Sequence, residues 1–240
     1  MITELDGPPD EVGGKAAGLS RLVELGLPVP PAVVVPVSAQ GVLGASEEVV
    51  ARLGEPLAVR SSAVGEDALD RSAAGQYETF TGVTGDTLTD AVARVWRSGA
   101  SDRARVYAGA SVPMAVVIQR EVVPSRSGVA FSRDPVTGER CILVESVFGH
   151  GERLVSGEIA PDRFRVEAER TVRARLAPKE GAFRLLRTLR DDELLLVAAL
   201  VRRCEDGFGH AVDVEFCFEK RTPWLVQCRP LTRGRETPTE

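Results

Sequence analysis

Two periods of apolar residues alternate along the chain, one typical of helices and the other of strands. Three segments with helical spacing are predicted to be helices: residues 13–25, 86–96 and 191–207. Short apolar or alternating segments are predicted to be strands: residues 32–37, 56–63, 114–123, 127–134 and 141–148, with hairpins over 163–177 and 211–232. The stretch between Val37 and Pro56 is polar and weakly patterned. Many strands in hairpins and few helices indicate an α+β fold with antiparallel sheets.

The C-terminal predicted hairpin has the clearest alternation, with apolar residues on one face and mostly polar residues on the other. If the chain turns about Arg221, Glu215 lies opposite Gln227, and Asp213 lies opposite Arg229. Carboxylate and amide oxygens are ligands for magnesium, and an arginine beside them can hold a phosphate. Ordinary solvent-exposed polar pairs on a strand are the alternative interpretation.

Three more polar residues stand in positions suited to a nucleotide. Lys15 follows two glycines at the start of a predicted helix, which favours phosphate, but the segment does not match a P-loop and a surface lysine is an alternative. Arg60 interrupts an apolar strand, where its guanidinium can bind phosphate or pair with Glu66 or Asp67. Gln119 interrupts another apolar strand, where its amide can read a nucleobase or meet solvent at an edge.

Composition narrows the class of protein further. With 240 residues, 43% of them hydrophobic, the chain is expected to form one globular unit of two lobes with a cleft between them. Its formal net charge of -5 disfavours nucleic acid as a partner and requires basic groups to be concentrated wherever an anion binds. The sequence has no basic leader and no apolar run of about 20 residues, so we expect a cytoplasmic protein that does not enter the membrane. The four cysteines lack C-x-x-C spacing and are predicted to be reduced core residues.

In their order along the chain these clusters resemble the ATP-grasp domain shared by pyruvate phosphate dikinase, phosphoenolpyruvate synthase and rifampicin phosphotransferase. The resemblance covers most of the chain and rests on these motifs: VGGKAAGLSRL, AVRSSAVGED, SAAGQYET, VVIQREVV, SGVAFSRDPVTGE, GHGERLVSGEIAPDRF, VDVEF and VQCRPLT. It implies two lobes with antiparallel sheets enclosing a nucleotide cleft. The expected N-terminal lobe spans residues 1–118 and the C-terminal lobe spans residues 119–232, followed by a disordered tail at 233–240.

The resemblance also implies that the cofactors are ATP and magnesium. The residues expected to bind them are Lys15, Arg60, Gly75, Thr79, Gln119, Asp213, Glu215, Gln227 and Arg229. Gln119 and neighbouring backbone would hold the adenine, while Glu215 and Gln227 would carry the magnesium ion. Asp213 would orient Arg229 or a metal-bound water.

The function implied by the resemblance is ATP-dependent phosphoryl transfer, with Lys15, Arg60 and Arg229 neutralising the triphosphate and with Arg60, Glu215 and Arg229 as the catalytic residues. In the related families the chain continues into a swivelling domain whose histidine accepts the phosphoryl group, and neither His150 nor His210 matches that histidine motif. We therefore expect transfer to a histidine on a separate protein, with release of AMP and phosphate. A stand-alone small-molecule kinase or ATP-grasp ligase is the first alternative, and a nucleotide-binding regulator without turnover is the second.

Overall fold

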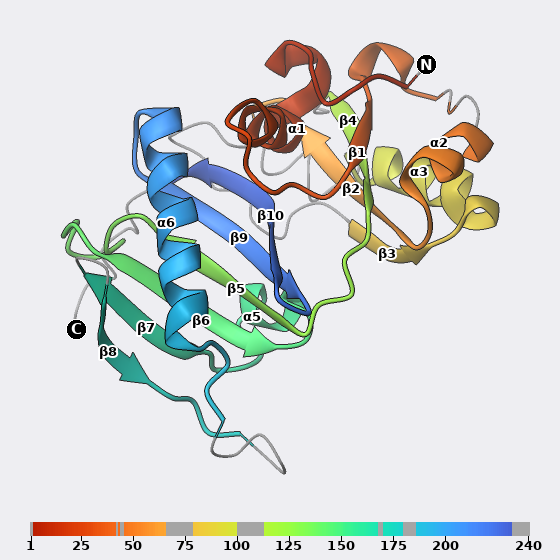
Figure 1. Ribbon diagram of the computed structural model, residues 1–240. Helices are drawn as coiled ribbons and strands as arrows, with labels where there is room; N and C mark the ends of the chain where they lie inside the picture. The colour runs from red at the N-terminus through yellow and green to blue at the C-terminus, as the bar shows by residue number, and fades with distance from the viewer. Residues whose placement is uncertain are drawn as a thin grey trace, which may run out of the picture. The chain divides into compact units, whose positions relative to one another are not determined.

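The strands of the described residues pair antiparallel and form two sheets (Figure 1). The computed structural model describes residues 2–41, 43, 46–65, 79–99, 113–167, 170–179 and 186–231. The helices are α1 (Pro9–Glu24), the short 3-10 helix η1 (Val37–Ala39), α2 (Ser46–Leu53), α3 (Gly85–Gly99), α5 (Glu152–Val155) and α6 (Asp191–Phe208). The strands are β1 (Ala32–Val35), β2 (Leu57–Ala63), β3 (Thr79–Val83), β4 (Met114–Arg120), β5 (Arg126–Phe131), β6 (Ile142–Phe148), β7 (Asp162–Glu167), β8 (Arg170–Arg175), β9 (Val212–Glu219) and β10 (Thr222–Pro230). The predicted α+β class with antiparallel sheets is confirmed.

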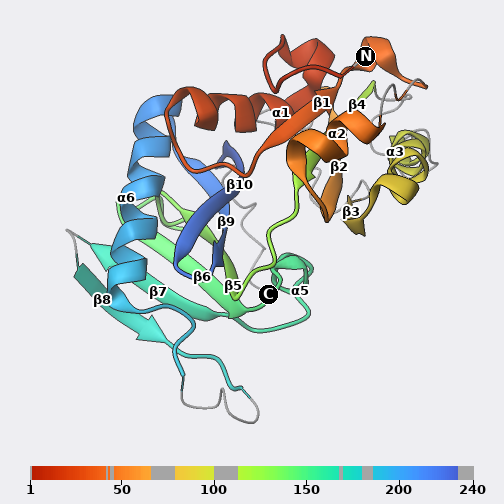
Figure 2. The same ribbon diagram turned by 45° about the vertical axis from the view of Figure 1, so that its right-hand side comes forward.

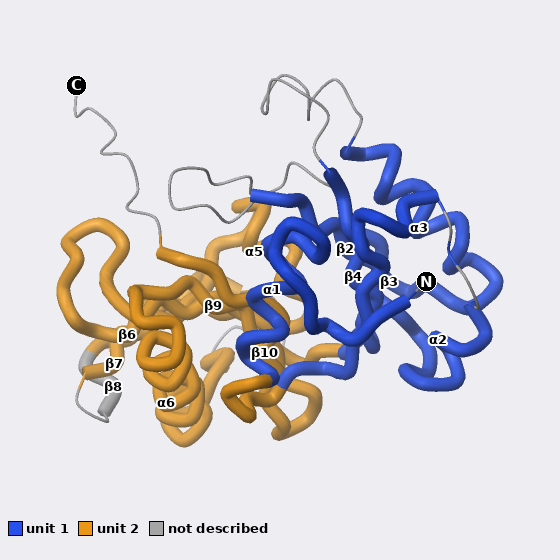
Figure 3. The backbone as a smooth tube through the Cα atoms, turned by 90° about the horizontal axis from the view of Figure 1, so that it is seen from above, with its two compact units in different colours: residues 1–23, 29–122 blue, residues 24–28, 123–240 orange. Residues whose placement is uncertain are grey.

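The chain divides into two units, one around each sheet (Figure 3). Unit 1 comprises residues 1–23 and 29–122, and unit 2 comprises residues 24–28 and 123–240. Gln119, the first residue of the expected C-terminal lobe, lies in β4 within unit 1. Among the described helices, none combines the length and apolarity needed to cross a membrane.

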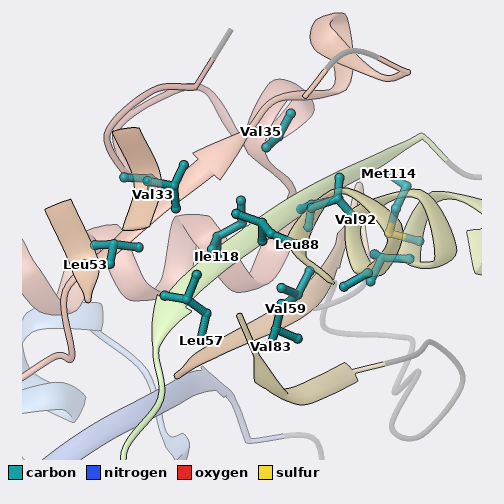
Figure 4. Packing of buried hydrophobic residues seen from close by; sticks show 14 of the residues in the cluster. Val33, Val35, Leu53, Leu57, Val59, Val83, Leu88, Val92, Met114 and Ile118 are labelled. Carbon is teal, nitrogen blue, oxygen red and sulfur yellow. The ribbon is translucent and has the colours of Figure 1, made fainter. Parts of the chain in front are cut away.

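Unit 1 is built on a four-stranded sheet in the order β1-β4-β2-β3. Helix α3 packs on one face of this sheet, where Leu88 and Val92 meet Val59 and Ile118 from the two central strands (Figure 4). All four side chains are fully buried. Burial of this apolar cluster stabilises the unit because it removes several large side chains from water.

Helix α2 was not predicted, because residues 46–53 give only two turns and a weak pattern. Val49 and Leu53 are its buried residues, and they join the cluster under α3. Acidic Glu47 and Glu48 in the first turn and basic Arg52 in the last turn match the helix dipole. The helix is therefore supported by tertiary packing of one edge and by charges at its ends, rather than by a wide apolar face.

Unit 2 is built on a six-stranded sheet in the order β10-β9-β5-β6-β7-β8, and α6 crosses one face of it (Figures 1 and 2). An ion pair shows which side chains point to the face covered by α6. Arg126 of β5 contacts Glu193 of α6 at 2.7 Å, and Phe218 of β9, which is directly opposite Arg126, points to the same face. Phe164, Phe216 and Phe218 are fully buried. All four cysteines are buried and none forms a disulfide, which confirms their assignment as reduced core residues.

The hairpin of β9 and β10 has the register that the alternation predicts at its polar end. Glu215 pairs with Gln227, and Asp213 pairs with Arg229. The chain turns at Lys220, whose φ is 57°, and a bulge between Leu225 and Gln227 shifts the register by one residue. This bulge brings the polar residues opposite each other, since the pairing next to the turn has a different register.

Candidate functional site

Ser62 of β2 ties the segment that carries Lys15 to the sheet of unit 1. Its hydroxyl donates to the carbonyl oxygen of Val12 at 2.7 Å and accepts from the N–H of Ala16 at 3.1 Å. Gly13 between them has φ +77°, and a Cβ there would collide with the carbonyl group of Ser62. Glycine is therefore required for the close approach, and half-buried Lys15 is positioned where the regular part of α1 begins.

Three of the predicted residues of unit 1 share one face of the sheet. Arg60 of β2 pairs with Thr79 of β3, and Ala58, two residues before Arg60, pairs with Gln119 of β4. Directly opposite residues of antiparallel strands point to the same side, and so do residues two apart on one strand. Arg60, Thr79 and Gln119 therefore point to the face that carries Ser62, away from the cluster under α3. Gly75 lies outside the described residues, as do Glu66 and Asp67, the suggested partners of Arg60.

Gln119 is not an edge residue that meets solvent, since only 2% of its surface is exposed. Its Nε2 donates to the carbonyl oxygen of Pro30 at 3.2 Å. The carbonyl group fixes which end of the amide is the donor, so Oε1 is the end available as an acceptor. This arrangement orients the amide in a way that suits a polar ligand group such as an exocyclic amine.

In unit 2 the polar face of the hairpin lies opposite α6. Asp213 and Glu215 alternate with apolar residues that point toward α6, so both carboxylates lie on the other side of the sheet. Arg229 donates from Nε and Nη2 to one oxygen of Asp213, Oδ2, at 2.9 and 2.7 Å. Within the described residues Oδ1 of Asp213 is buried and has no hydrogen-bond partner. Gln227 is as buried as Asp213, with 6% of each residue exposed.

Burial raises the pKa of the Asp213 carboxyl above its ordinary value, although the contact with Arg229 acts in the opposite direction. The nearby negative charges of Glu215 and Glu145 raise this pKa further. An ionised Asp213 therefore costs free energy in the absence of a further cation. Oδ1 is thus a buried acceptor that the contact with Arg229 does not use.

Glu145 and Arg163, which the sequence did not identify, lie on the same face of this sheet. A row of directly paired residues runs across five strands from β10 to β7 in the order Gln227, Glu215, Val129, Glu145 and Arg163. Arg163 Nε contacts Glu145 Oε1 at 2.7 Å. In the sequence Glu145 is only one polar residue in an alternating strand, so its place beside the hairpin depends on the strand order of the sheet.

The donor set of unit 2 fits magnesium. Magnesium prefers oxygen ligands, keeps several waters and is held by few protein groups together with substrate phosphates. Glu215 supplies a carboxylate, Gln227 supplies an amide oxygen, and the open oxygen of Asp213 adds negative potential. Among the residues that the structure describes, no group of three or more His, Cys, Asp or Glu side chains is arranged to hold a metal ion alone.

The predicted residues thus form two sets, each on one face of its own sheet. Unit 1 brings together Lys15, Arg60, Thr79 and Gln119 by way of Ser62 and the pairing of β2 with its neighbours. Unit 2 brings together its four hairpin residues. One set is suited to an anion and a polar ring, and the other to an anion with its metal ion.

A family comparison assigns this architecture. Residues 39–240 match the model of the pyruvate phosphate dikinase AMP/ATP-binding domain, so the chain belongs to that family. This result confirms the resemblance to the ATP-grasp domain of pyruvate phosphate dikinase, phosphoenolpyruvate synthase and rifampicin phosphotransferase.

Individual relatives are similar over most of the chain. A rifampicin phosphotransferase from Streptomyces sp is 36% identical over 254 residues, covering 95% of this chain and 28% of the relative. A probable phosphoenolpyruvate synthase from Archaeoglobus fulgidus is 36% identical over 212 residues, covering 77% of this chain and 28% of the relative. The prodigiosin synthesizing transferase PigC of Serratia marcescens is 32% identical over 294 residues, covering 97% of this chain and 33% of the relative. The chain therefore spans at most a third of these curated relatives.

Among solved structures, the ATP complex of D-alanine--D-alanine ligase from Bacillus anthracis is similar to 90% of this chain and 54% of its own, with 14% identity and a TM-score of 0.49.

Proposed function

We propose that the chain binds ATP with magnesium and transfers a phosphoryl group from it to an acceptor. The observation that carries this proposal is the paired row of the β9–β10 hairpin, where a carboxylate, an amide oxygen and an arginine share one face. A site that only recognised adenine would not need this set, because it is suited to charge that develops on phosphate oxygens. Membership of the AMP/ATP-binding domain family supports the choice of nucleotide.

In this proposal Lys15, Arg60 and Arg229 neutralise the triphosphate, and Thr79 and Gly75 belong to the nucleotide-binding set. Gln119 offers its Oε1 to the adenine, because its Nε2 is used by the main chain. These side chains bind and orient the nucleotide. A cytoplasmic location is part of the proposal, since ATP is a cytoplasmic metabolite.

Glu215 and Gln227 would hold magnesium, which when bound neutralises the negative charge of the phosphates. Asp213 keeps Arg229 oriented toward the phosphate end, because its Oδ2 accepts a hydrogen bond from Nε and lies 2.7 Å from Nη2. Arg60, Glu215 and Arg229 are the residues on which we expect the rate of transfer to depend most.

The acceptor in the proposal is a histidine on a separate protein, and the products are AMP and inorganic phosphate. The probable phosphoenolpyruvate synthase among the relatives supports a dikinase-like reaction. The names of two other relatives, a rifampicin phosphotransferase and a prodigiosin synthesizing transferase, favour a small-molecule acceptor as the second candidate. A regulator without turnover is the third, and the magnesium-suited row argues against it.

Chromatographic identification of the nucleotide product tests the proposal. The purified chain is incubated with Mg-ATP and either candidate small molecules or a separate histidine-domain protein, and a Glu215→Gln variant serves as control. AMP with phosphate, lost in the variant, is the expected result. Stoichiometric ADP would overturn the dikinase-like reaction and leave a kinase. Binding without any turnover in the presence of every acceptor would favour the regulator.

A further inference from the structure

Three carboxylates gather on the face of the unit 2 sheet opposite α6. Asp213 and Glu215 lie on β9, and Glu145 lies on β6 with Val129 of β5 between it and Glu215. Neighbouring strands are about 4.8 Å apart, so the Cα atoms of Glu145 and Glu215 are roughly 10 Å from each other. The two side chains point to the same side of the sheet, because each is directly paired with Val129.

Each outer carboxylate of this group is held by its own arginine. Arg229 binds Asp213 through Oδ2, and Arg163 binds Glu145 through Oε1 at 2.7 Å. Glu145 is more buried than its partner, with 25% of its side chain exposed against 58% for Arg163. The Asp213 pair engages Oδ2 alone, so Arg229 orients this carboxylate without using all of its acceptor capacity.

A third carboxylate on this face is unfavourable for ATP alone, because the triphosphate is a polyanion and like charges repel at these distances. A divalent cation between the phosphates and the carboxylates reverses the sign of the interaction. The buried Oδ1 of Asp213, which has no hydrogen-bond partner within the described residues, is an independent sign that a positive or proton-donating ligand belongs there. Three acidic residues, one of them with an unused buried oxygen, therefore favour carboxylates that contact the waters of the cation in addition to those that bind it directly.

We propose that Glu145, positioned by Arg163, accepts a hydrogen bond from a water of the magnesium ion that Glu215 and Gln227 hold. Contact through water fits the spacing of two strands and the finding that no three acidic side chains of the described residues hold a metal ion directly. Magnesium gives up its waters reluctantly, so a carboxylate at this distance stabilises the hydrated ion without displacing its water. This inference rests on the proposed magnesium site of the hairpin.

Binding of Mn²⁺ in place of magnesium tests the inference without any measurement of turnover. Electron paramagnetic resonance reports free Mn²⁺ as it is titrated into the chain with a non-hydrolysable ATP analogue. We expect Glu145→Gln to weaken Mn²⁺ binding by about tenfold, the lower end of the loss for groups that orient metal ligands. Arg163→Gln should give a smaller loss, because the carboxylate stays but is no longer oriented.

Glu139→Gln is the matched control, since Glu139 is also an arginine-paired carboxylate, bound by Arg165 at 2.8 Å in the turn between β5 and β6. It carries the same change in charge away from the row and should leave Mn²⁺ affinity unchanged. Affinity for the analogue without metal should not fall in any variant, and it should rise in Glu145→Gln, because a negative charge near the triphosphate is removed. The unfolding temperature without metal checks that each variant is folded. If Glu145→Gln lowers this temperature, the Mn²⁺ affinity of Arg163→Gln is the result that tests the role of Glu145.

The possible failures are distinguishable by including Glu215→Gln. If Glu215→Gln weakens Mn²⁺ binding but Glu145→Gln behaves like Glu139→Gln, the magnesium site stands and the role of Glu145 is wrong. If the wild-type chain binds no Mn²⁺ with the analogue, the proposed function itself fails. The inference would also be overturned if Glu145→Gln lost as much affinity for the metal-free analogue as for Mn²⁺. Such a result would indicate a general disturbance of the site.

Discussion

Arg229 holds Asp213 by a single oxygen, with both Nε and Nη2 donating to Oδ2 at 2.9 and 2.7 Å. The more usual contact between these groups is bidentate, with each nitrogen on a separate oxygen. Here Oδ1 is left buried without a partner within the described residues, and burial raises the pKa of the carboxyl. The pair therefore leaves one buried acceptor oxygen of Asp213 unused within the described residues.

In the nucleotide-free chain, we expect Asp213→Asn to change the unfolding temperature relative to the wild type in a way that depends on pH. The variant should compare better with the wild type at high pH than at low pH. A carboxyl whose folded pKa is raised binds its proton more tightly in the folded state, so the wild-type chain gains stability as the pH falls through that folded pKa. Asparagine does not titrate. The unfolding temperature of the variant minus that of the wild type should thus decrease as the pH falls from neutral toward the ordinary titration range of an aspartate. A difference that is constant or increases toward low pH would contradict the raised pKa.

Glu215→Ala should reduce turnover far more than nucleotide binding. The carboxylate acts where charge develops on the phosphates during transfer, so the expected loss of turnover is about a hundredfold or more. Nucleotide affinity is measured by calorimetry with and without magnesium, and turnover by product chromatography. The variant should also lose most of the gain in affinity that magnesium gives. Unchanged turnover would remove Glu215 from the site.

Lysine should not replace Arg60 or Arg229 without loss of ATP affinity. A guanidinium offers several N–H groups in a fixed plane, whereas an ammonium is a point charge, so one charged hydrogen bond is lost in each variant. Such a bond contributes about 1.5–3 kcal/mol, which corresponds to a loss of affinity of roughly tenfold or more. Calorimetric titration of Arg60→Lys and Arg229→Lys checks this, with Arg153→Lys, which changes an exposed arginine paired with Glu158, as control. Wild-type affinity in both variants would refute the phosphate contacts.

Gly13→Ala should destabilise the chain more than Gly54→Ala. Both glycines have positive φ, +77° and +75°, so each alanine is strained by about 1–2 kcal/mol. At Gly54 no atom lies within 4 Å of the added Cβ, but at Gly13 the Cβ meets the carbonyl group of Ser62. Thermal unfolding of both variants gives the comparison, and ATP affinity should fall in the Gly13 variant because the segment of Lys15 moves. Equal unfolding temperatures would show that the contact with Ser62 is not required.

The sequence predicted the fold class and the polar hairpin because both depend on local patterns. Strict alternation through Asp213 and Glu215 defines two faces, and the short connection leaves few choices of partner strand. The bulge at Val226 was not predictable, since a period of two residues looks the same with or without an inserted position. The register at Glu215 was correct because the bulge offsets the difference between the expected and observed turn.

Contacts between residues distant in sequence were not accessible in this way. Glu145 joins the face of Glu215 only because β5 lies between β6 and β9, and strand order is not encoded in local periodicity. In the sequence Ser62 is only a small polar residue near Arg60, because its two hydrogen bonds to α1 connect segments 46 and 50 residues apart. The sequence also did not show which end of the Gln119 amide could face a ligand. The hydrogen bond from Nε2 to Pro30 shows this.

Unit 2 includes a short piece of the N-terminal part of the chain, residues 24–28, and this has a practical consequence for dissecting the protein. The carbonyl oxygen of Pro28 accepts from the N–H of Leu225 at 2.7 Å, and Arg203 of α6 donates to the carbonyl oxygen of Leu25 at the same distance. Leu25 also packs directly on Gly207. A fragment that starts at Val123 would lack residues 24–28, which contact α6 and β10. Strand β10 carries Gln227 and Arg229. A split version that keeps the metal-suited hairpin intact must therefore carry residues 24–28 on the second fragment, for instance by circular permutation.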